Sequence, residues 1–190
     1  ALCLNNLGSL CLTMREDDAA GVHLRQGLAI CERDGIVGTR GYILSNLTDL
    51  ALRAGDLAAA ESHAGHAIEV ATASGNRAVL SWAKTKVASL AVRRGDNVAA
   101  RSALAEGLSV ALELGSPSLK FYAVESFAEL LSAQGEVSCA RRVLTYAADH
   151  PTASAPVRDE IRRRLETLPA AVNATPPWPK PSRTTCSPSE

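Results

Sequence analysis

The same kinds of residue return every forty positions along most of this chain. One apolar position recurs as Leu7, Leu47, Val87 and Phe127, and a position for a small residue recurs as Ala20, Ala60, Ala100 and Ala140. A turn signal lies between these positions, at Gly55-Asp56, Gly95-Asp96 and Gly135-Glu136, with Arg15-Glu16 in the first unit. A fixed period of this length is typical of proteins in which one supersecondary unit stacks on the next.

Each unit contains the pattern of two helices. In the second unit, the first helix has one apolar face, made of Ile43, Leu47, Leu50, Ala51 and Ala54. Gly55 can end this helix because glycine accepts the left-handed conformation, and Asp56 can cap the next helix. We therefore predict an all-α fold, a right-handed α-α superhelix of stacked antiparallel helix hairpins, with units at about 1–40, 41–80, 81–120 and 121–156.

The pattern changes after Asp149. His150-Pro151 interrupts the second helix of the fourth unit, and a helix over 157–168 follows, in which arginines alternate with acidic residues. A terminal helix with a polar outer face is expected as a cap on a helical repeat, so the repeat domain should span 1–168. Residues 169–190 are rich in proline, serine and threonine, and we expect a disordered tail there.

Charge and cysteine content exclude several classes of protein. Twenty basic residues balance twenty acidic ones, which argues against direct binding of nucleic acid or of an anionic membrane. Five cysteines without a C-x-x-C pair indicate a reducing compartment, and we predict a cytoplasmic protein. Because Ala1 lies inside a helical pattern, we also expect the chain to be part of a longer protein.

The unit resembles the tetratricopeptide repeat. The resemblance rests on Leu47-x-x-Leu50, Gly55-Asp56, Ala60 and Ala67-Ile68, together with Leu7-Gly8 and Ala20, and it covers about residues 1–149. The family repeat is about 34 residues long, so these units are longer. In that longer form they are similar to the repeats of large ATPase-linked transcriptional activators of bacteria. Departures from the family pattern are Arg15 at the first turn and Ala88 and Ala128 at the position of Gly8.

The resemblance implies that the first helix of each hairpin lines a concave groove that contacts partners. Shifted by forty residues from unit to unit, the groove positions are Asn5, Ser9, Leu12, Ser45, Asp49, Arg53, Thr85, Ser89, Arg93, Glu125, Glu129 and Ser132. Tyr42, Trp82 and Tyr122 share one phase and would form an aromatic edge to this groove.

Arg53 and Arg93 occupy equivalent positions in adjacent units and admit two interpretations. Together they would suit a ligand that bears a carboxylate. Alternatively, they are surface residues near the ends of helices, where cations are favoured without any ligand.

We expect a non-catalytic scaffold that binds a protein, a peptide or another domain of its parent protein, without a cofactor. One alternative is a sensor module of an ATP-dependent transcriptional activator, although the chain itself contains no phosphate-binding Gly-Lys-Ser/Thr loop. A less favoured alternative is a metal- or thiol-dependent enzyme that uses His63, His66 and a cysteine, although no third metal ligand follows the two histidines in the sequence. The first helix would leave Leu4, Leu7 and Leu10 without a preceding hairpin, which allows a homo-oligomer through this face.

Overall fold

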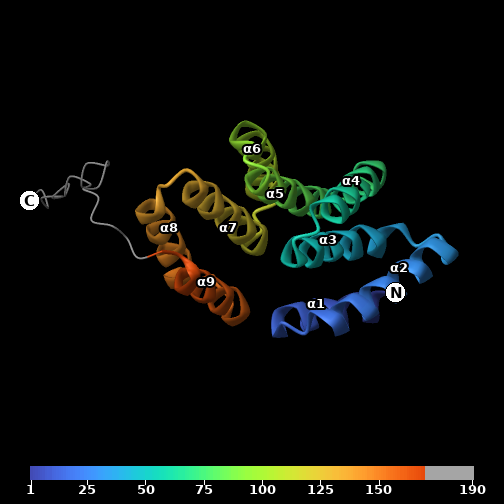
Figure 1. The fold of residues 1–190 in the computed structure, drawn as a ribbon. Coiled ribbons are helices and arrows are strands. Elements are labelled where there is room, and N and C mark those ends of the chain that lie inside the picture. The colour runs from blue at the N-terminus through green and yellow to red at the C-terminus, as the bar shows by residue number, and fades with distance from the viewer. Residues whose placement is uncertain (170–190) are drawn as a thin grey trace, which may run out of the picture.

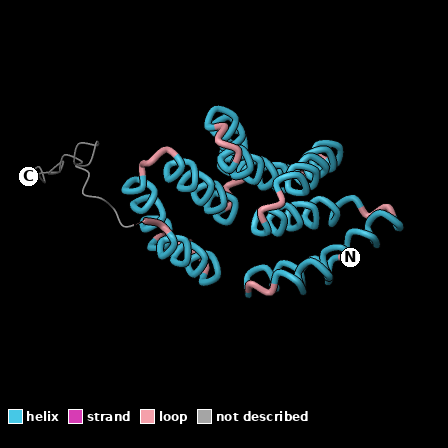
Figure 2. Tube along the Cα trace, in the orientation of Figure 1, coloured by secondary structure: helices cyan, strands magenta, loops and turns pink. Residues whose placement is uncertain are grey.

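The computed structural model describes residues 1–169, and the regular elements in that range are α-helices joined by short turns (Figures 1 and 2). This confirms the predicted all-α helical repeat. The helices are α1 (Leu2–Met14), α2 (Asp17–Asp34), α3 (Val37–Ala54), α4 (Leu57–Ser74), α5 (Arg77–Arg93), α6 (Asn97–Glu113), α7 (Pro117–Ala133), α8 (Val137–Asp149) and α9 (Ala155–Thr167).

The helix boundaries repeat with the period of the sequence. The second helices of the hairpins begin at Asp17, Leu57, Asn97 and Val137, forty residues apart. The turns before three of them contain Gly55, Gly95 and Gly135, whose φ values are 76°, 78° and 82°. Arg15 adopts the same left-handed conformation at the first turn, with φ 64°, although a side chain makes this conformation less favourable there.

The predicted N-caps are present in the two middle units. Asp56 accepts a hydrogen bond from the backbone N–H of Ala59, and Asp96 accepts one from Ala99, each at 2.9 Å. Each carboxylate thus satisfies one of the backbone donors that a helix leaves free at its start.

The helices form an inner and an outer row. Consecutive helices pack against each other, and each odd-numbered helix also contacts the next odd-numbered helix, so α1, α3, α5, α7 and α9 form the inner row. The small residues at the recurring position are fully buried where the two helices of a hairpin meet, at Ala20, Ala60, Ala100 and Ala140. On the predicted apolar face of α3, Ile43, Leu47 and Ala51 are buried, whereas Ala54 is exposed because it is the last residue of the helix.

Polar side chains join neighbouring units of the inner row. Arg53 Nη1 donates to the carbonyl oxygen of Leu12 at 2.7 Å, and Arg93 Nη1 donates in the same way to Leu52 at 2.6 Å. Both acceptors lie in the last turn of the preceding inner helix, where carbonyl groups lack a partner within the helix. We call Arg53 and Arg93 the bridging arginines.

Helix α9 continues the inner row and brings it round towards its beginning. Ile161 is fully buried in a cluster with Leu144 and Phe121. Arg15, which directly follows α1, forms an ion pair with Glu160 of α9 at 2.8 Å, and Figure 1 shows the ends of α1 and α9 facing each other. Helix α9 begins two residues before the predicted 157 and ends one before 168. The predicted tail lies outside the described residues, apart from Pro169.

Within residues 1–169, part of the apolar surface of α1 is not covered by another helix. Leu7 and Leu10 are 45% and 53% exposed, whereas Leu47 and Leu90, which occupy the same positions in later units, are each 4% exposed. Leu4 is only partly buried. The sequence-based expectation of an open apolar face on α1 agrees with these exposures.

A polar cavity on the inner helices

A cavity of about 420 Å³ opens on the inner row. Side chains of all five inner helices line it, and we call it the inner cavity. The residues that line it include Ser9, Thr13, Asp49, Arg53, Trp82, Lys86, Ser89, Arg93, Tyr122, Glu125, Glu129, Glu160 and Arg164. The continuous row of inner helices therefore encloses a single polar space.

Most of the predicted groove residues line this cavity. They are Ser9, Leu12, Asp49, Arg53, Trp82, Ser89, Arg93, Glu125 and Glu129. Three other predicted residues do not line it but are buried within the inner row. Asn5 accepts a hydrogen bond from Asn46, Ser45 donates to the carbonyl oxygen of Gly41, and Thr85 donates to that of Trp82. Ser132 and Tyr42 also lie outside the lining.

Several lining residues were not predicted. Lys86 follows Thr85 and shares its repeat position with Asn6, Asn46 and Ser126, a run of polar residues that was a usable signal. Glu160 and Arg164 were assigned to a solvated cap, but α9 is in effect the first helix of a fifth unit. Its inward side therefore faces the inner cavity, like that of the other inner helices.

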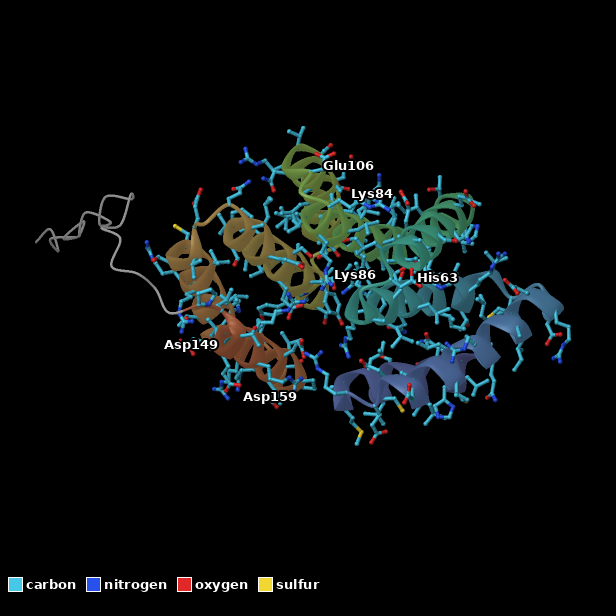
Figure 3. The ribbon with its side chains drawn as sticks, in the orientation of Figure 1. His63, Lys84, Lys86, Glu106, Asp149 and Asp159 are labelled. Carbon is cyan, nitrogen blue, oxygen red and sulfur yellow. The ribbon has the colours of Figure 1, made fainter. Side chains whose placement is uncertain are left out.

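An ion-paired cluster connects α2, α3 and α5. Lys86 Nζ lies 2.7 Å from Asp49 Oδ1, and Arg53 pairs with Asp49 at 3.4 Å and with Asp17 at 3.2 Å. Burial raises the pKa of Asp49, but attraction by Lys86 and Arg53 outweighs it and holds this pKa below its ordinary value. Figure 3 labels Lys86 near the middle of the row.

Arg93 also has partners within the protein, because it pairs with Glu129 at 3.5 Å besides its hydrogen bond to Leu52. Both bridging arginines thus use their guanidinium groups between repeat units. A ligand carboxylate would therefore have to replace existing partners, and Arg53, with 18% of its side chain exposed, is not the surface residue of the second interpretation.

Two aromatic rings form one wall of the cavity. Trp82 and Tyr122 are stacked, with ring centroids 5.4 Å apart and an angle of 9° between the planes. Lys86 Nζ lies 5.7 Å from the centroid of the Tyr122 ring. Burial, followed by the nearby Glu125 and Asp49, raises the pKa of Tyr122 to about 12. The wall therefore offers a flat, uncharged surface beside the ionic cluster.

Glu125 differs from the other acidic residues of the cavity. It is 8% exposed and forms no hydrogen bond or ion pair with another residue of 1–169. Burial raises its pKa to about 6, although Arg164 and Lys86 attract the ionised form. Trp82 and Arg164 also line the cavity, but their Nε1 and Nε atoms are closed off from solvent and have no hydrogen-bond partner in the described part of the chain.

The candidate metal or catalytic residues do not assemble into a site in the described residues. His63 and His66 lie on α4, and burial together with His66 lowers the pKa of His63. Nowhere in 1–169 do three side chains of histidine, cysteine, aspartate or glutamate come together in a group that could hold a metal ion.

A second cavity, of about 1100 Å³, lies along α7 and α8 and is mostly apolar. Val124, Cys139 and Val143 contribute to its lining. Helix α8 has 13 residues, whereas α4 has 18, so α8 covers less of its partner helix. This cavity lacks the buried, unpaired polar groups of the inner cavity.

Comparisons with known proteins add no assignment: no model of a protein family matches the chain, and no curated protein matches it. Among the described residues, no helix combines the length and the apolar content that crossing a bilayer requires. What the chain does must therefore be argued from the fold and the inner cavity.

Proposed function

We propose that this chain is a non-catalytic binding scaffold whose inner cavity receives a segment of a protein or peptide, supplied by another molecule or by another domain of its parent protein. The observation that supports this proposal is the single polar cavity on five adjacent inner helices. It presents an aromatic wall and paired charges in one place. Such a combination suits recognition of a polar chain segment.

The arrangement of the repeat supports the resemblance to tetratricopeptide proteins, in which the first helices of the hairpins bind partners. The bridging arginines and the Lys86–Asp49 pair hold neighbouring inner helices together. Because these contacts already exist in the unbound protein, binding a partner would cost little conformational entropy. A cytoplasmic location is supported by Cys3, Cys11, Cys31 and Cys139, which form no disulfide within residues 1–169.

The test is to obstruct the inner cavity without breaking the contacts between units. Ser9 lines the cavity and its side chain takes part in none of the ion pairs described above. A Ser9→Arg variant of the full chain would place a long cation in the cavity. Ala105→Arg is the matched control, because Ala105 is exposed on the outer helix α6. Both variants should retain the circular dichroism spectrum of the wild type.

Proteins captured from a lysate are then compared among the three forms by mass spectrometry. The proposal expects at least one protein that the wild type and Ala105→Arg retain equally and that Ser9→Arg loses. If all captured proteins bind the three forms equally, or if none is captured, the inner cavity is not the working surface.

A further inference from the structure

Glu125 carries a charge at a repeat position that is neutral in the other three units. The equivalent positions in the first three units hold Asn5, Ser45 and Thr85, which are neutral, buried and hydrogen-bonded within the inner row. The fourth unit holds a buried acid that has no partner in 1–169. The fold therefore tolerates a neutral residue at this position, and an unpaired buried carboxylate is unfavourable unless something compensates it.

Three bases of the inner cavity are already paired with acids. Lys86 pairs with Asp49, Arg53 with Asp49 and Asp17, and Arg93 with Glu129. Arg164 is attracted by Glu125 and Glu129 but forms no ion pair with either in the described structure. The cavity thus contains one carboxylate that still lacks a cation in direct contact.

The unpaired carboxylate sets a requirement on the ligand. Glu125 needs a donor with positive charge. A basic residue of a peptide supplies it, because its side chain is a cationic donor. A cavity of about 420 Å³ has room for one such side chain and the adjoining backbone.

Building on the proposed function, we propose that the inner cavity binds an arginine or lysine side chain of a peptide partner, which pairs with Glu125. The aromatic wall lies beside this position and would contact the aliphatic part of the bound side chain. Glu125 is the residue that determines specificity.

The proposal includes a pH dependence. The charged groups that act on Glu125 are Arg164 of α9 and Lys86 of α5, which attract its ionised form, and Glu160 of α9 and Asp49 of α3, which repel it. Tyr122 on α7 stays neutral, since its pKa is about 12. Because the pKa of Glu125 is about 6, the affinity for a cation should rise as the pH passes through this value and level off above it.

The test uses four acetylated, amidated pentapeptides of the form Ala-Ala-X-Ala-Ala, where X is arginine, lysine, citrulline or glutamate. Citrulline has nearly the shape of arginine but no charge. The protein is the full chain with Trp178→Phe, which leaves Trp82 as the single tryptophan reporter in the cavity. Binding is followed by tryptophan fluorescence at pH 7.5 and at pH 5.

The arginine and lysine peptides should bind about tenfold more tightly than the citrulline peptide at pH 7.5, as one charge-assisted contact warrants. This preference should shrink at pH 5 and disappear in Glu125→Gln. Glu166→Gln is the matched control, because Glu166 is an exposed acid on α9 and its replacement should leave the preference unchanged.

Three results would overturn the inference: equal binding of arginine and citrulline peptides, an undiminished preference in Glu125→Gln, or no binding of any peptide. Failure of this inference alone can be distinguished from failure of the proposed function. If a captured protein is lost with Ser9→Arg but is retained by Glu125→Gln, the inner cavity is still the working surface and only the requirement for a cation is wrong.

Discussion

Replacing Glu125 by glutamine should make the protein less sensitive to rising pH. In the folded chain the pKa of Glu125 is about 6, against an ordinary value of 4.5, because the side chain is buried. Between these values the folded state binds more protons than the unfolded state, so the wild type loses stability as the pH rises. Each pKa unit corresponds to about 1.4 kcal/mol, which makes the full loss about 2 kcal/mol.

Glutamine does not ionise, and so the variant should escape this loss. Urea denaturation followed by far-ultraviolet circular dichroism measures the free energy of unfolding of both proteins at pH 4 and pH 8. Relative to the wild type, Glu125→Gln should gain about 2 kcal/mol between these two pH values. The difference between the two pH values cancels any pH-independent effect of the glutamine side chain on the free energy of unfolding.

Glu129→Gln is the matched control, since Glu129 lies one helical turn further along α7 and pairs with Arg93 at 3.5 Å. It should lose up to about 1 kcal/mol at pH 8, because its ionised form makes a favourable, partly exposed ion pair. A difference between wild type and Glu125→Gln that is independent of pH, or that has the opposite sign, would refute the description of Glu125 as a buried, uncompensated acid.

Three further predictions concern the repeat itself. Leu90→Ala should cost about 2–5 kcal/mol in urea denaturation, because Leu90 is 4% exposed and packs with Leu52 and Ala60 across two units; a cost below about 1 kcal/mol would contradict this packing. Ala60→Leu should overpack the contact between α3 and α4, cost about 1–3 kcal/mol and lower the melting temperature; an unchanged melting temperature would show that the hairpin has spare room. Leu7→Gln combined with Leu10→Gln should reduce self-association in light scattering, since both side chains are about half exposed; unchanged association would remove this face as its cause.

The sequence predicted the hairpins well because each unit repeats the same pattern of small, turn and capping residues. Ala60 and Ala100 mark the close helix contact, and Asp56 and Asp96 mark the helix starts, so four units report on one arrangement. The turn at Arg15 could be assigned from its equivalents even without glycine. An isolated hairpin would have given a weaker prediction, since its apolar pattern would have been seen only once.

The inner cavity was predicted only in part. Forty-residue spacing identifies which residues face inward, but it does not tell a lining residue such as Glu125 from a hydrogen-bonded one such as Thr85. That difference depends on side-chain partners. The approach of α9 to α1 through Glu160 and Arg15 depends on small rotations summed over four hairpins, which the sequence pattern does not specify.

The most direct test of the central claim is site-specific photocrosslinking in the full chain. Benzoylphenylalanine placed at Thr13, an exposed residue on the rim of the inner cavity, reports on partners of the inner row, and the same group at Ala105 reports on the outer helices. The account predicts a partner crosslinked from Thr13 and not from Ala105. A partner crosslinked from Ala105 alone would contradict it.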